Sequence, residues 1–350
     1  MKRRNDVIRF ENDYAEGAHP RILELLGKTN FEQTPGYGED AYCDRARVLI
    51  REICRTKTAE VHFLVGGTQA NATVIASILR PHQGVVCAET GHINVHESGA
   101  IEATGHKVLP LESRDGKITA SQVQMAIEDH WNDVTHEHMV QPGMVYVSFP
   151  TENGTIYTKA ELTELSRVCR HYNLPLYLDG ARLGYGLMAE GNDLTLPDIA
   201  ELCDVFYIGG TKVGALFGEA VVITRESLKK DFRYLMKQHG GLLAKGRLLG
   251  IQFVALMENN LYFDISSHAD RQAARIRDAF TQKGYSFLYD STTNQQFPII
   301  SKAELEKLEQ KYAFSLWKHV DEHHRAVRIC TSWATKDEDV SLLVEDILSL

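Results

Sequence analysis

The sequence has no long hydrophobic run, no excess of positive charge and no low-complexity tract. No apolar stretch approaches the roughly 20 residues of a membrane span. The start, MKRRNDVIRFEND, also lacks the apolar core of a signal peptide. The formal net charge of −9 leaves no concentrated basic face for a nucleic acid. We therefore expect neither membrane association nor a nucleic-acid partner.

Closely spaced cysteines are also missing. The six cysteines are scattered and never form a C-x-x-C pair: Cys43, Cys54, Cys87, Cys169, Cys203 and Cys330. Neither a zinc site nor a disulfide framework is predicted, and the reducing cytoplasm is the compartment that fits best. A G-x-x-x-x-G-K-[ST] loop is absent as well, so a nucleoside-triphosphate site is not expected.

The composition is that of an ordinary globular protein. The chain has 350 residues, 43% of them apolar and 24% charged, which is enough for a large core and two domains. Short apolar segments alternate with helical ones, which predicts an α/β fold with a mostly parallel sheet covered on both faces. Strands are predicted at 61–65, 85–89, 106–111 and 144–150, and helices at about 42–55, 92–104, 120–131 and after the capping-box spacing of Thr158 and Glu161.

The pattern changes after Thr224. Helices dominate 228–280, interrupted by GGLLAKGR at 240–247, and short mixed segments follow to the end. We therefore predict an N-terminal arm (1–15), a large domain (16–260) and a smaller α+β C-terminal domain (261–350).

Two polar residues stand near the ends of apolar strands. Asp179 follows Leu-Tyr-Leu in LPLYLDGARLGYG, and Lys212 follows the apolar run 205–208 across a Gly-Gly-Thr turn. An acid and an amine that converge on one ligand are what a protein needs to hold pyridoxal phosphate (PLP). The acid serves the pyridinium nitrogen and the amine forms the Schiff base. A strand-end aspartate and a solvated lysine are the alternative interpretation.

A glycine-rich turn, GGTQAN at 66–71, lies between a predicted strand and a predicted helix. Glycines there let backbone amides at a helix start approach an anion, and Thr68 adds a hydroxyl donor. A plain strand–helix turn with Thr68 as N-cap explains the pattern equally well. If the turn binds an anion, a small phosphate is the best candidate.

His92 and Arg328 are further candidates. His92 follows a strand end, where an imidazole could stack on a planar cofactor and transfer protons, although a capping or surface histidine is the commoner case. His96 lies one helical turn on, but no third ligand at suitable spacing supports a metal site. Arg328 lies inside the apolar run AVRIC, which predicts an anionic partner: a substrate carboxylate or an acidic side chain.

Taken together, these segments resemble the low-specificity L-threonine aldolases, in the β-eliminating-lyase branch of the fold-type-I PLP-dependent enzymes. The resemblance covers nearly the whole chain. It rests on YGED (37–40), GGTQAN (66–71), GHINVHESG, TENG (151–154), LDGAR (178–182) and the lysine after GGT. It implies a large sheet domain like that of aspartate aminotransferase and a small α+β domain. It also implies homodimers or homotetramers with active sites between subunits.

The resemblance implies a cofactor role for each matching residue. Lys212 would form the Schiff base with PLP, and Asp179 would pair with the pyridinium nitrogen. Arg182 would lie beside the cofactor and bind its ring hydroxyl or the substrate carboxylate. His92 would stack on the ring. The phosphate would be held by Gly67, Thr68 and Gln69.

Substrate binding and proton transfer are implied for other positions. Arg328 and Asn12 would bind the amino-acid carboxylate, with Asn12 where the family often has a serine. Glu152 stands in the TENG turn, where relatives often carry a histidine. His92, or a water held by Glu152 and His92, would take up a hydroxyl proton. Lys245 lies near the place of a usual arginine and would contact the phosphate across a subunit boundary.

The implied reaction is the PLP-dependent cleavage of a β-hydroxy-α-amino acid, L-threonine or L-allo-threonine, to glycine and an aldehyde. Holding the Cα–Cβ bond perpendicular to the cofactor ring would select this outcome. One alternative is another PLP reaction on the same fold, β-elimination or transamination. The other is a non-catalytic binding protein that keeps the fold, against which the paired Asp179 and Lys212 argue.

Overall fold

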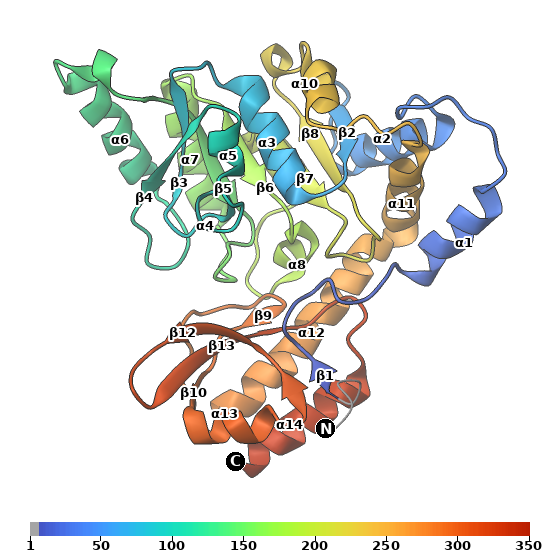
Figure 1. The fold of residues 1–350 in the computed structure, drawn as a ribbon, viewed down its shortest axis with the longest axis vertical. Helices are drawn as coiled ribbons and strands as arrows, with labels where there is room; N and C mark the ends of the chain where they lie inside the picture. The colour runs from blue at the N-terminus through green and yellow to red at the C-terminus, as the bar shows by residue number, and fades with distance from the viewer. Residues whose placement is uncertain (1–6) are drawn as a thin grey trace.

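A seven-stranded sheet forms the centre of the computed structural model, which describes residues 7–350; residues 1–6 of the predicted arm lie outside the described part. The strand order is β2-β8-β7-β6-β5-β3-β4 (Figure 1). The strands are β2 (Glu60–Leu64), β3 (Gln83–Ala88), β4 (Lys107–Leu111), β5 (Gln141–Ser148), β6 (Leu176–Asp179), β7 (Val205–Gly209) and β8 (Glu219–Ile223). From β4 to β7 neighbours are parallel, and β8 is antiparallel to both its neighbours. The predicted mostly parallel sheet is confirmed.

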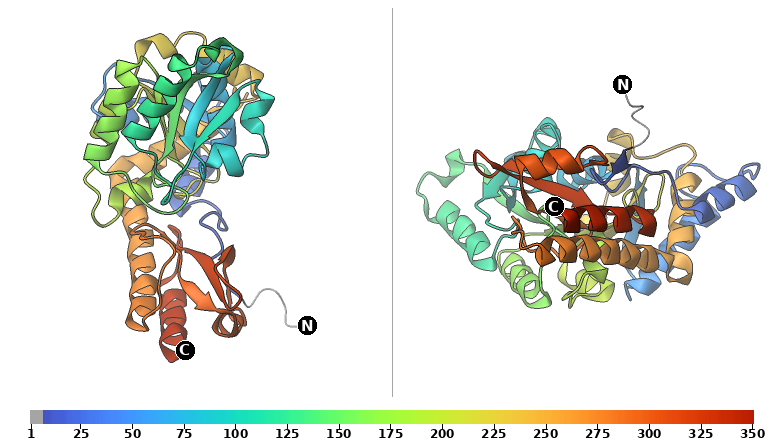
Figure 2. Two further views of the ribbon diagram at one scale, coloured as in Figure 1. Left: turned by 90° about the vertical axis from the view of Figure 1, so that its left-hand side faces the viewer. Right: turned by 90° about the horizontal axis from the view of Figure 1, so that it is seen from below.

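Residues along each strand alternate between two hydrophobic clusters, one on each face of the sheet. On β5, Val145 and Val147 belong to one cluster and Met144 and Tyr146 to the other. Because both faces are buried, the strands are nearly continuous apolar runs. Helices α2 (Ala41–Ile53), α6 (Ala120–Asn132), α7 (Lys159–His171), α9 (Leu196–Leu202) and α11 (Arg247–Met257) join the first cluster, and α3 (Gly67–Ile78), α5 (Ala100–Ala103) and α10 (Phe232–Gln238) join the second (Figure 2).

Two local predictions have different outcomes. The capping box of α7 is confirmed, because Thr158 Oγ1 accepts from the Glu161 N–H and the Glu161 carboxylate accepts from the Thr158 N–H. The helix predicted over 92–104 is wrong as a single element, since α4 (His92–Val95) and α5 are separate. Between them Ser98 and Gly99 have φ values of 53° and 74°, a left-handed backbone that interrupts a helix.

The C-terminal part of the chain forms a second sheet, below the first in Figure 1. Its long strand β13 (His324–Cys330) pairs antiparallel with β9 (Gln295–Gln296), β10 (Ile299–Ser301) and β12 (Ser315–His319). A third hydrophobic cluster joins this sheet to its helices. These helices are α12 (Leu261–Gln282), α13 (Lys302–Leu308) and α14 (Asp337–Ser349).

The segment before α1 (Pro20–Thr29) joins the two sheets. Strand β1 (Ile8–Arg9) pairs parallel with β11 (Tyr312–Ala313) beside the C-terminal sheet. Further along, the His19 N–H donates to the carbonyl of Gly214, in the turn after β7. Figure 1 shows this segment running from the C-terminal sheet toward the central one. Asp13, between these two attachments, lies fully buried where the sheets meet.

Shorter elements complete the fold: α8 (Leu183–Met188) and the 3₁₀ turns η2 (His136–His138), η3 (Glu226–Leu228) and η4 (Glu258–Asn260). All six cysteines are buried and unpaired. Within residues 7–350, no helix has the length and apolar character needed to cross a bilayer. In the same range, no three His, Cys, Asp or Glu side chains gather in a way that could hold a metal ion.

Candidate active site

Asp179 and Lys212 lie at the same edge of the central sheet. Asp179 ends β6, and Lys212 follows β7 by a short turn. Because β6 and β7 are parallel neighbours, their carboxyl ends meet. Both side chains line a cavity of about 320 Å³. The two residues therefore converge on this cavity, and Lys212 also lines a second cavity of about 550 Å³.

A close approach of two strands explains the glycine of the LDGAR motif. A Cβ on Gly180 would lie 1.9 Å from the carbonyl oxygen of Tyr207, and no side chain tolerates that distance. The following N–H, of Ala181, donates to Asp179 Oδ1 at 3.0 Å. The motif therefore fixes both the strand spacing and the direction of the carboxylate.

Three side chains hold the Asp179 carboxylate. Tyr146 donates its hydroxyl to Oδ2 at 2.6 Å, Asn71 Nδ2 donates to the same oxygen at 3.0 Å, and the Tyr207 hydroxyl donates to Oδ1. Burial alone would raise the pKa of Asp179, but the charge of His92 and the tyrosine hydrogen bonds outweigh it and lower that pKa. A carboxylate that stays ionised can keep a pyridinium nitrogen protonated.

The amine of Lys212 lies beside a permanent positive charge. The Tyr185 hydroxyl donates to the Lys212 carbonyl at 2.5 Å, which fixes the backbone. Enclosure lowers the pKa of Lys212, and the Arg182 guanidinium lowers it further against the opposing charges of Asp13 and Asp179. A lowered pKa leaves more of the amine in its neutral, nucleophilic form.

The start of α3 lines the 320 Å³ cavity with a glycine turn that is suited to bind an anion. Gly66, the N-cap, has no side chain to cap the first N–H groups of the helix, so they remain free for an anion. Gly66, Gly67 and Thr68 all line the cavity. A Cβ on Gly67 would lie 3.0 Å from the Tyr207 hydroxyl, so glycine keeps this end open. The arrangement fits a phosphate group.

His92 is linked to Asp179 through two buried polar residues. Its Nδ1 lies 2.7 Å from Glu97 Oε1, and Asn71 Nδ2 donates to that same oxygen at 2.7 Å. Burial alone would lower the pKa of His92, but the Glu97 hydrogen bond and the Asp179 charge outweigh it and raise that pKa. Because Nδ1 is bound to a carboxylate, Nε2 is the ring nitrogen left for chemistry.

Glu152 brings a carboxylate oxygen without a partner to the same place. Its Oε1 accepts from the His92 N–H at 3.0 Å and from the Ser148 hydroxyl at 2.7 Å. Its Oε2 is buried and has no hydrogen-bond partner among the described residues. Burial raises the pKa of Glu152 despite the opposing Ser148 bond. Since Glu152 lines both cavities, it is placed to exchange a proton with a ligand.

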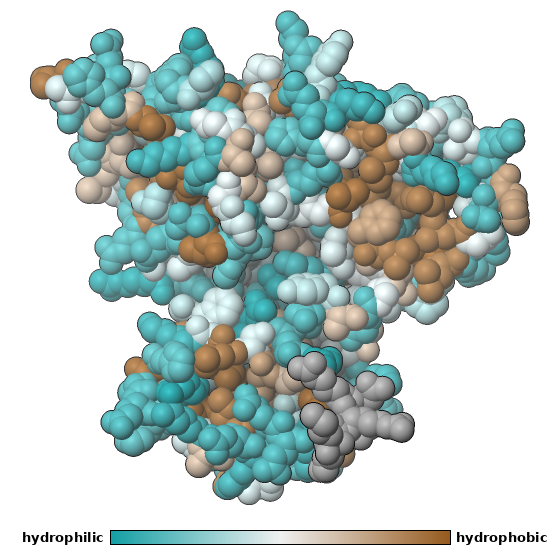
Figure 3. All heavy atoms as spheres, viewed as in Figure 1, coloured by the Kyte–Doolittle hydropathy of each residue, from teal (hydrophilic) through white to brown (hydrophobic). Residues whose placement is uncertain are grey.

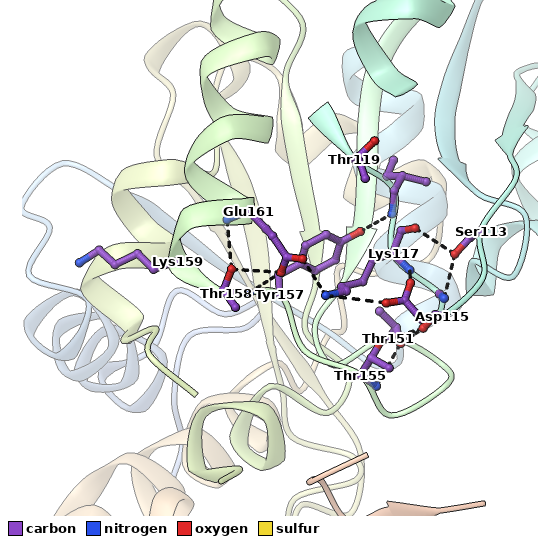
Figure 4. Close-up of polar contacts among 12 residues, drawn as sticks. Ser113, Asp115, Lys117, Thr119, Thr151, Thr155, Tyr157, Thr158, Lys159 and Glu161 are labelled. Carbon is purple, nitrogen blue, oxygen red and sulfur yellow. Dashed lines mark hydrogen bonds and ion pairs between the residues drawn. The ribbon is translucent and has the colours of Figure 1, made fainter. Parts of the chain in front are cut away.

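The turn that carries Glu152 is held from outside the cavities (Figure 4). Thr155, in this turn, donates its hydroxyl to the Asp115 carbonyl at 2.8 Å. The neighbouring Lys117 ammonium lies 2.8 Å from Glu161 Oε1, on α7. The turn at 113–118 therefore joins the Glu152 turn to a helix of the large sheet.

Arg328 reaches the second cavity from β13. Its Nη2 donates to the Glu11 carbonyl at 3.1 Å, and its guanidinium lies 5.2 Å from the centre of the Trp317 ring. Its Nε is buried and has no partner within residues 7–350. An arginine with an unused donor beside an open cavity is suited to bind a carboxylate.

Arg182 lines both cavities and is already paired. Its Nε and Nη2 donate to the two oxygens of Asp13 at 2.6 and 3.0 Å, and Asn294 Nδ2 donates to Asp13 at 2.9 Å. Burial alone would raise the pKa of Asp13, but the Arg182 charge outweighs it and lowers the pKa to about 2. The pair therefore stays ionised throughout the physiological pH range.

Three predicted site residues do not line either cavity. The side chain of Gln69 is bound to the backbone at both ends, to the Val65 N–H at 3.0 Å and to the His239 carbonyl at 2.9 Å. Asn12 Oδ1 accepts a backbone N–H two residues further on. Lys245 is exposed just before α11. In this single chain, Gln69, Asn12 and Lys245 therefore do not line the cavities on which the other predicted site residues converge.

A family model described as beta-eliminating lyase matches residues 24–303, which is most of the chain. The chain belongs to the beta-eliminating lyase family. Enzymes of this family and fold depend on PLP, which agrees with the chemistry of the Lys212 and Asp179 cavity.

The relatives of this lyase include threonine aldolases. A low specificity L-threonine aldolase of Pseudomonas aeruginosa is 29% identical over 342 residues, which cover 97% of this chain and 96% of the relative. A solved threonine aldolase of Leishmania major is 43% identical with a TM-score of 0.94, covering 97% of this chain and 98% of that one. A Thermus thermophilus aspartate aminotransferase, 15% identical, shares the fold at a TM-score of 0.72 over 98% of this chain and 91% of its own. The resemblance and the fold class predicted from the sequence are confirmed.

Sequence reasoning missed several polar side chains of the lyase site: Asp13, Asn71, Glu97, Tyr207 and Glu219. Asn71 and Glu97 lie within motifs that the sequence analysis quotes, GGTQAN and GHINVHESG. Asn71 lies three and four residues before the apolar Val74 and Ile75, so helical spacing places it on the apolar face of the helix, a signal that could have found it. Asp13 gives no such signal, because its partner Arg182 is 169 residues away in the chain.

Proposed function

We propose that this lyase uses PLP to cleave L-threonine or L-allo-threonine to glycine and an aldehyde. The proposal rests on one observation: Lys212, Asp179 and the start of α3 line a single cavity. The chain is related over nearly its whole length to threonine aldolases. The adjoining cavity holds Arg328, Glu152 and His92, the groups that an amino-acid substrate with a hydroxyl requires.

PLP fits the residues of the first cavity. Lys212, with its lowered pKa, would hold the cofactor covalently, and the ionised Asp179 would pair with the ring nitrogen. The backbone at Gly67 and Thr68 would bind the phosphate, and His92 would stack on the ring. When bound, PLP supplies an electron sink for the electron pair that carbon–carbon cleavage leaves behind.

The residues of the second cavity would orient the substrate and move its proton. Arg328 would bind the amino-acid carboxylate, assisted by Arg182 and by Asn12 after a local movement. Glu152 Oε2 would take the proton of the β-hydroxyl group, because it is a buried carboxylate oxygen without a partner on a residue that lines both cavities. His92 would keep its place through its bond to Glu97, with Nε2 toward the ligand.

Product analysis tests the proposed reaction. The purified protein is supplied with PLP and with L-threonine, L-allo-threonine or a β-substituted amino acid. The expected products from the first two are glycine and acetaldehyde in equal amounts. Release of ammonia and a keto acid in their place would establish the runner-up, β-elimination. Transfer of the amino group to an added keto acid would establish transamination.

The ionisation of Glu152 is expected to determine how turnover depends on pH. A general base must be ionised, and burial raises the pKa of Glu152 above its ordinary 4.5. The turnover number kcat should therefore fall as the pH drops through that raised pKa. Glu152→Gln should lower kcat by about 10²–10⁴-fold and abolish this acidic limb. A Glu152→Gln enzyme that kept the limb would contradict the assignment; Glu112→Gln, at an exposed position, is the control.

Arg328 is expected to contribute to the affinity for the amino-acid substrate. Arg328→Ala should raise KM for threonine about 10- to 100-fold with a smaller effect on kcat, because it removes a hydrogen-bonded charge partner of the carboxylate. Arg325→Ala, on the same strand with its Nη1 bound to backbone carbonyls, is the matched control. Steady-state kinetics distinguish the two. An unchanged KM in Arg328→Ala would show that another group binds the carboxylate.

We infer a dimer or tetramer with sites shared between subunits. Figure 3 shows apolar surface gathered over the part of the molecule where Figure 1 places α1, α2 and α11. Exposed apolar side chains in and between these elements include Leu23, Phe31, Tyr37 and Val48, and such patches mark interfaces. Lys245, just before α11, would then reach a phosphate in the neighbouring subunit. Light scattering that gave a monomer mass would contradict this arrangement.

A reducing cytoplasm is the proposed location, because all six cysteines are unpaired.

A further inference from the structure

Glu219 is a buried acid that the proposed mechanism does not use. It begins β8 and is 3% exposed. On one side it pairs with Leu64, at the end of the strand that precedes the glycine turn of α3. On the other it pairs with Gly209, the last residue of β7. Glu219 thus lies between the anion-binding turn and the turn that carries Lys212, and it lines the cavity with both.

The Glu219 side chain holds the turn that presents Lys212. Its Oε1 accepts from the Thr211 hydroxyl at 2.7 Å, and its Oε2 accepts from the Gly210 N–H at 3.1 Å. The Thr211 Oγ1 in turn accepts from the Gly218 N–H at 3.0 Å. Gly210 and Thr211, the two residues before the lysine, are therefore bound to one carboxyl group. The Thr211 hydroxyl also bonds to Gly218, the residue just before β8.

Glu219 and Lys212 each affect the pKa of the other. Burial raises the pKa of Glu219 to about 8, opposed by the Thr211 bond and the Lys212 charge and supported by Asp179. Glu219 in turn raises the pKa of Lys212. Three buried tyrosines also lie near enough for the Glu219 charge to act on them: Tyr177 of β6, Tyr207 of β7 and Tyr262 of α12.

We propose that Glu219 is the positioning residue of Lys212. Its carboxyl group binds Gly210 and Thr211, the two residues before the lysine, and so fixes the turn that presents the amine to the cavity. Without these bonds the amine would reach its reacting position in a smaller fraction of the molecules. The inference rests on the proposed role of Lys212 in holding PLP.

The test follows the rate at which the apoenzyme captures PLP, using the visible absorbance of the bound cofactor. Glu219→Gln keeps the side-chain size, but its amide has one oxygen and can accept from only one of the two partners, so it should slow capture about 10-fold. Glu219→Ala removes both bonds and should slow capture about 10²-fold. In both variants kcat should fall while KM for threonine stays unchanged, because the carboxylate is bound elsewhere. Thr211→Val removes only the hydroxyl contact and should slow capture less than Glu219→Ala.

The outcomes separate this inference from the proposed function. Wild-type protein that stays colourless with PLP would remove the proposed function itself. If wild-type protein takes up PLP and Glu219→Ala takes it up at the same rate, only the role of Glu219 is overturned. The Thr211→Val enzyme decides the question where the Glu219 variants fold poorly, since an unchanged rate of capture in that variant would equally overturn the proposal.

Discussion

Lys212→Ala protein is expected to stay colourless when PLP is supplied and to lose at least about 10³-fold in kcat. The variant lacks the only amine among the described residues that lines the 320 Å³ cavity, so the cofactor cannot be held covalently. Without a covalently held cofactor the variant also lacks the electron sink that carbon–carbon cleavage requires. The absorbance spectrum of dialysed protein measures the first effect, and acetaldehyde release from threonine measures the second.

The controls for this experiment separate chemistry from folding. Lys307→Ala, an exposed lysine on α13, should keep both the colour and the activity. The far-ultraviolet circular dichroism of Lys212→Ala should match that of the wild type. A visible band that survives dialysis in Lys212→Ala would assign the covalent bond to a different lysine.

Asp13→Ala is expected to be among the most destabilising single changes in this protein. It removes the only charge partner that the structure shows for the buried Arg182 guanidinium. Breaking a buried ion pair by removing one partner costs about 3–5 kcal/mol. The amide of Asn294 loses an acceptor in the same step. The thermal unfolding temperature of the apoenzyme should therefore fall, and Arg182 should lose its place beside the cavities.

Acid unfolding gives a second measurement of the same pair. The folded pKa of Asp13, about 2, lies below its ordinary 3.8. The stabilisation is therefore complete above pH 3.8 and is lost as the pH falls toward 2. Asp13→Ala should lack this part of the acid transition, whereas Glu11→Ala, at a half-buried neighbouring residue paired with Arg9, should keep it. Equal stability of Asp13→Ala and wild type would show that the buried pair is dispensable.

Local patterns in the sequence predicted the parts of the site that sit at strand ends. Apolar runs identify β6 and β7, and the residues that follow a buried parallel strand necessarily reach the carboxyl edge of the sheet. That is why Asp179 and Lys212 could be predicted to converge. The glycine turn before α3 was predictable for the same reason, since Gly66 and Gly67 follow a strand and start a helix.

The remaining site residues depend on contacts that no local pattern encodes. Glu97 meets His92 because helix α4 ends at Val95, far earlier than the periodicity predicts, and His96 leaves the helical conformation with φ −127° and ψ 11°. Glu219 appears in the sequence as an ordinary polar residue before a strand. Its burial becomes visible only when β2 and β7 are paired on either side of it. Which side chains meet across the sheet depends on the tertiary structure and cannot be read from a local sequence pattern.

The Asp13 contacts also set the order in which the active site can be completed. Asp13 is joined to Arg182 and to Asn294, which lie 169 and 281 residues further along the chain. During synthesis the aspartate emerges first, yet its amide partner is made only when most of the protein already exists. Contacts between such distant segments form late, because a large loop must close before they gain anything. The side of the cavity at Arg182 therefore forms only after the C-terminal sheet has packed against the rest of the chain. A newly made chain becomes catalytically competent late in its folding.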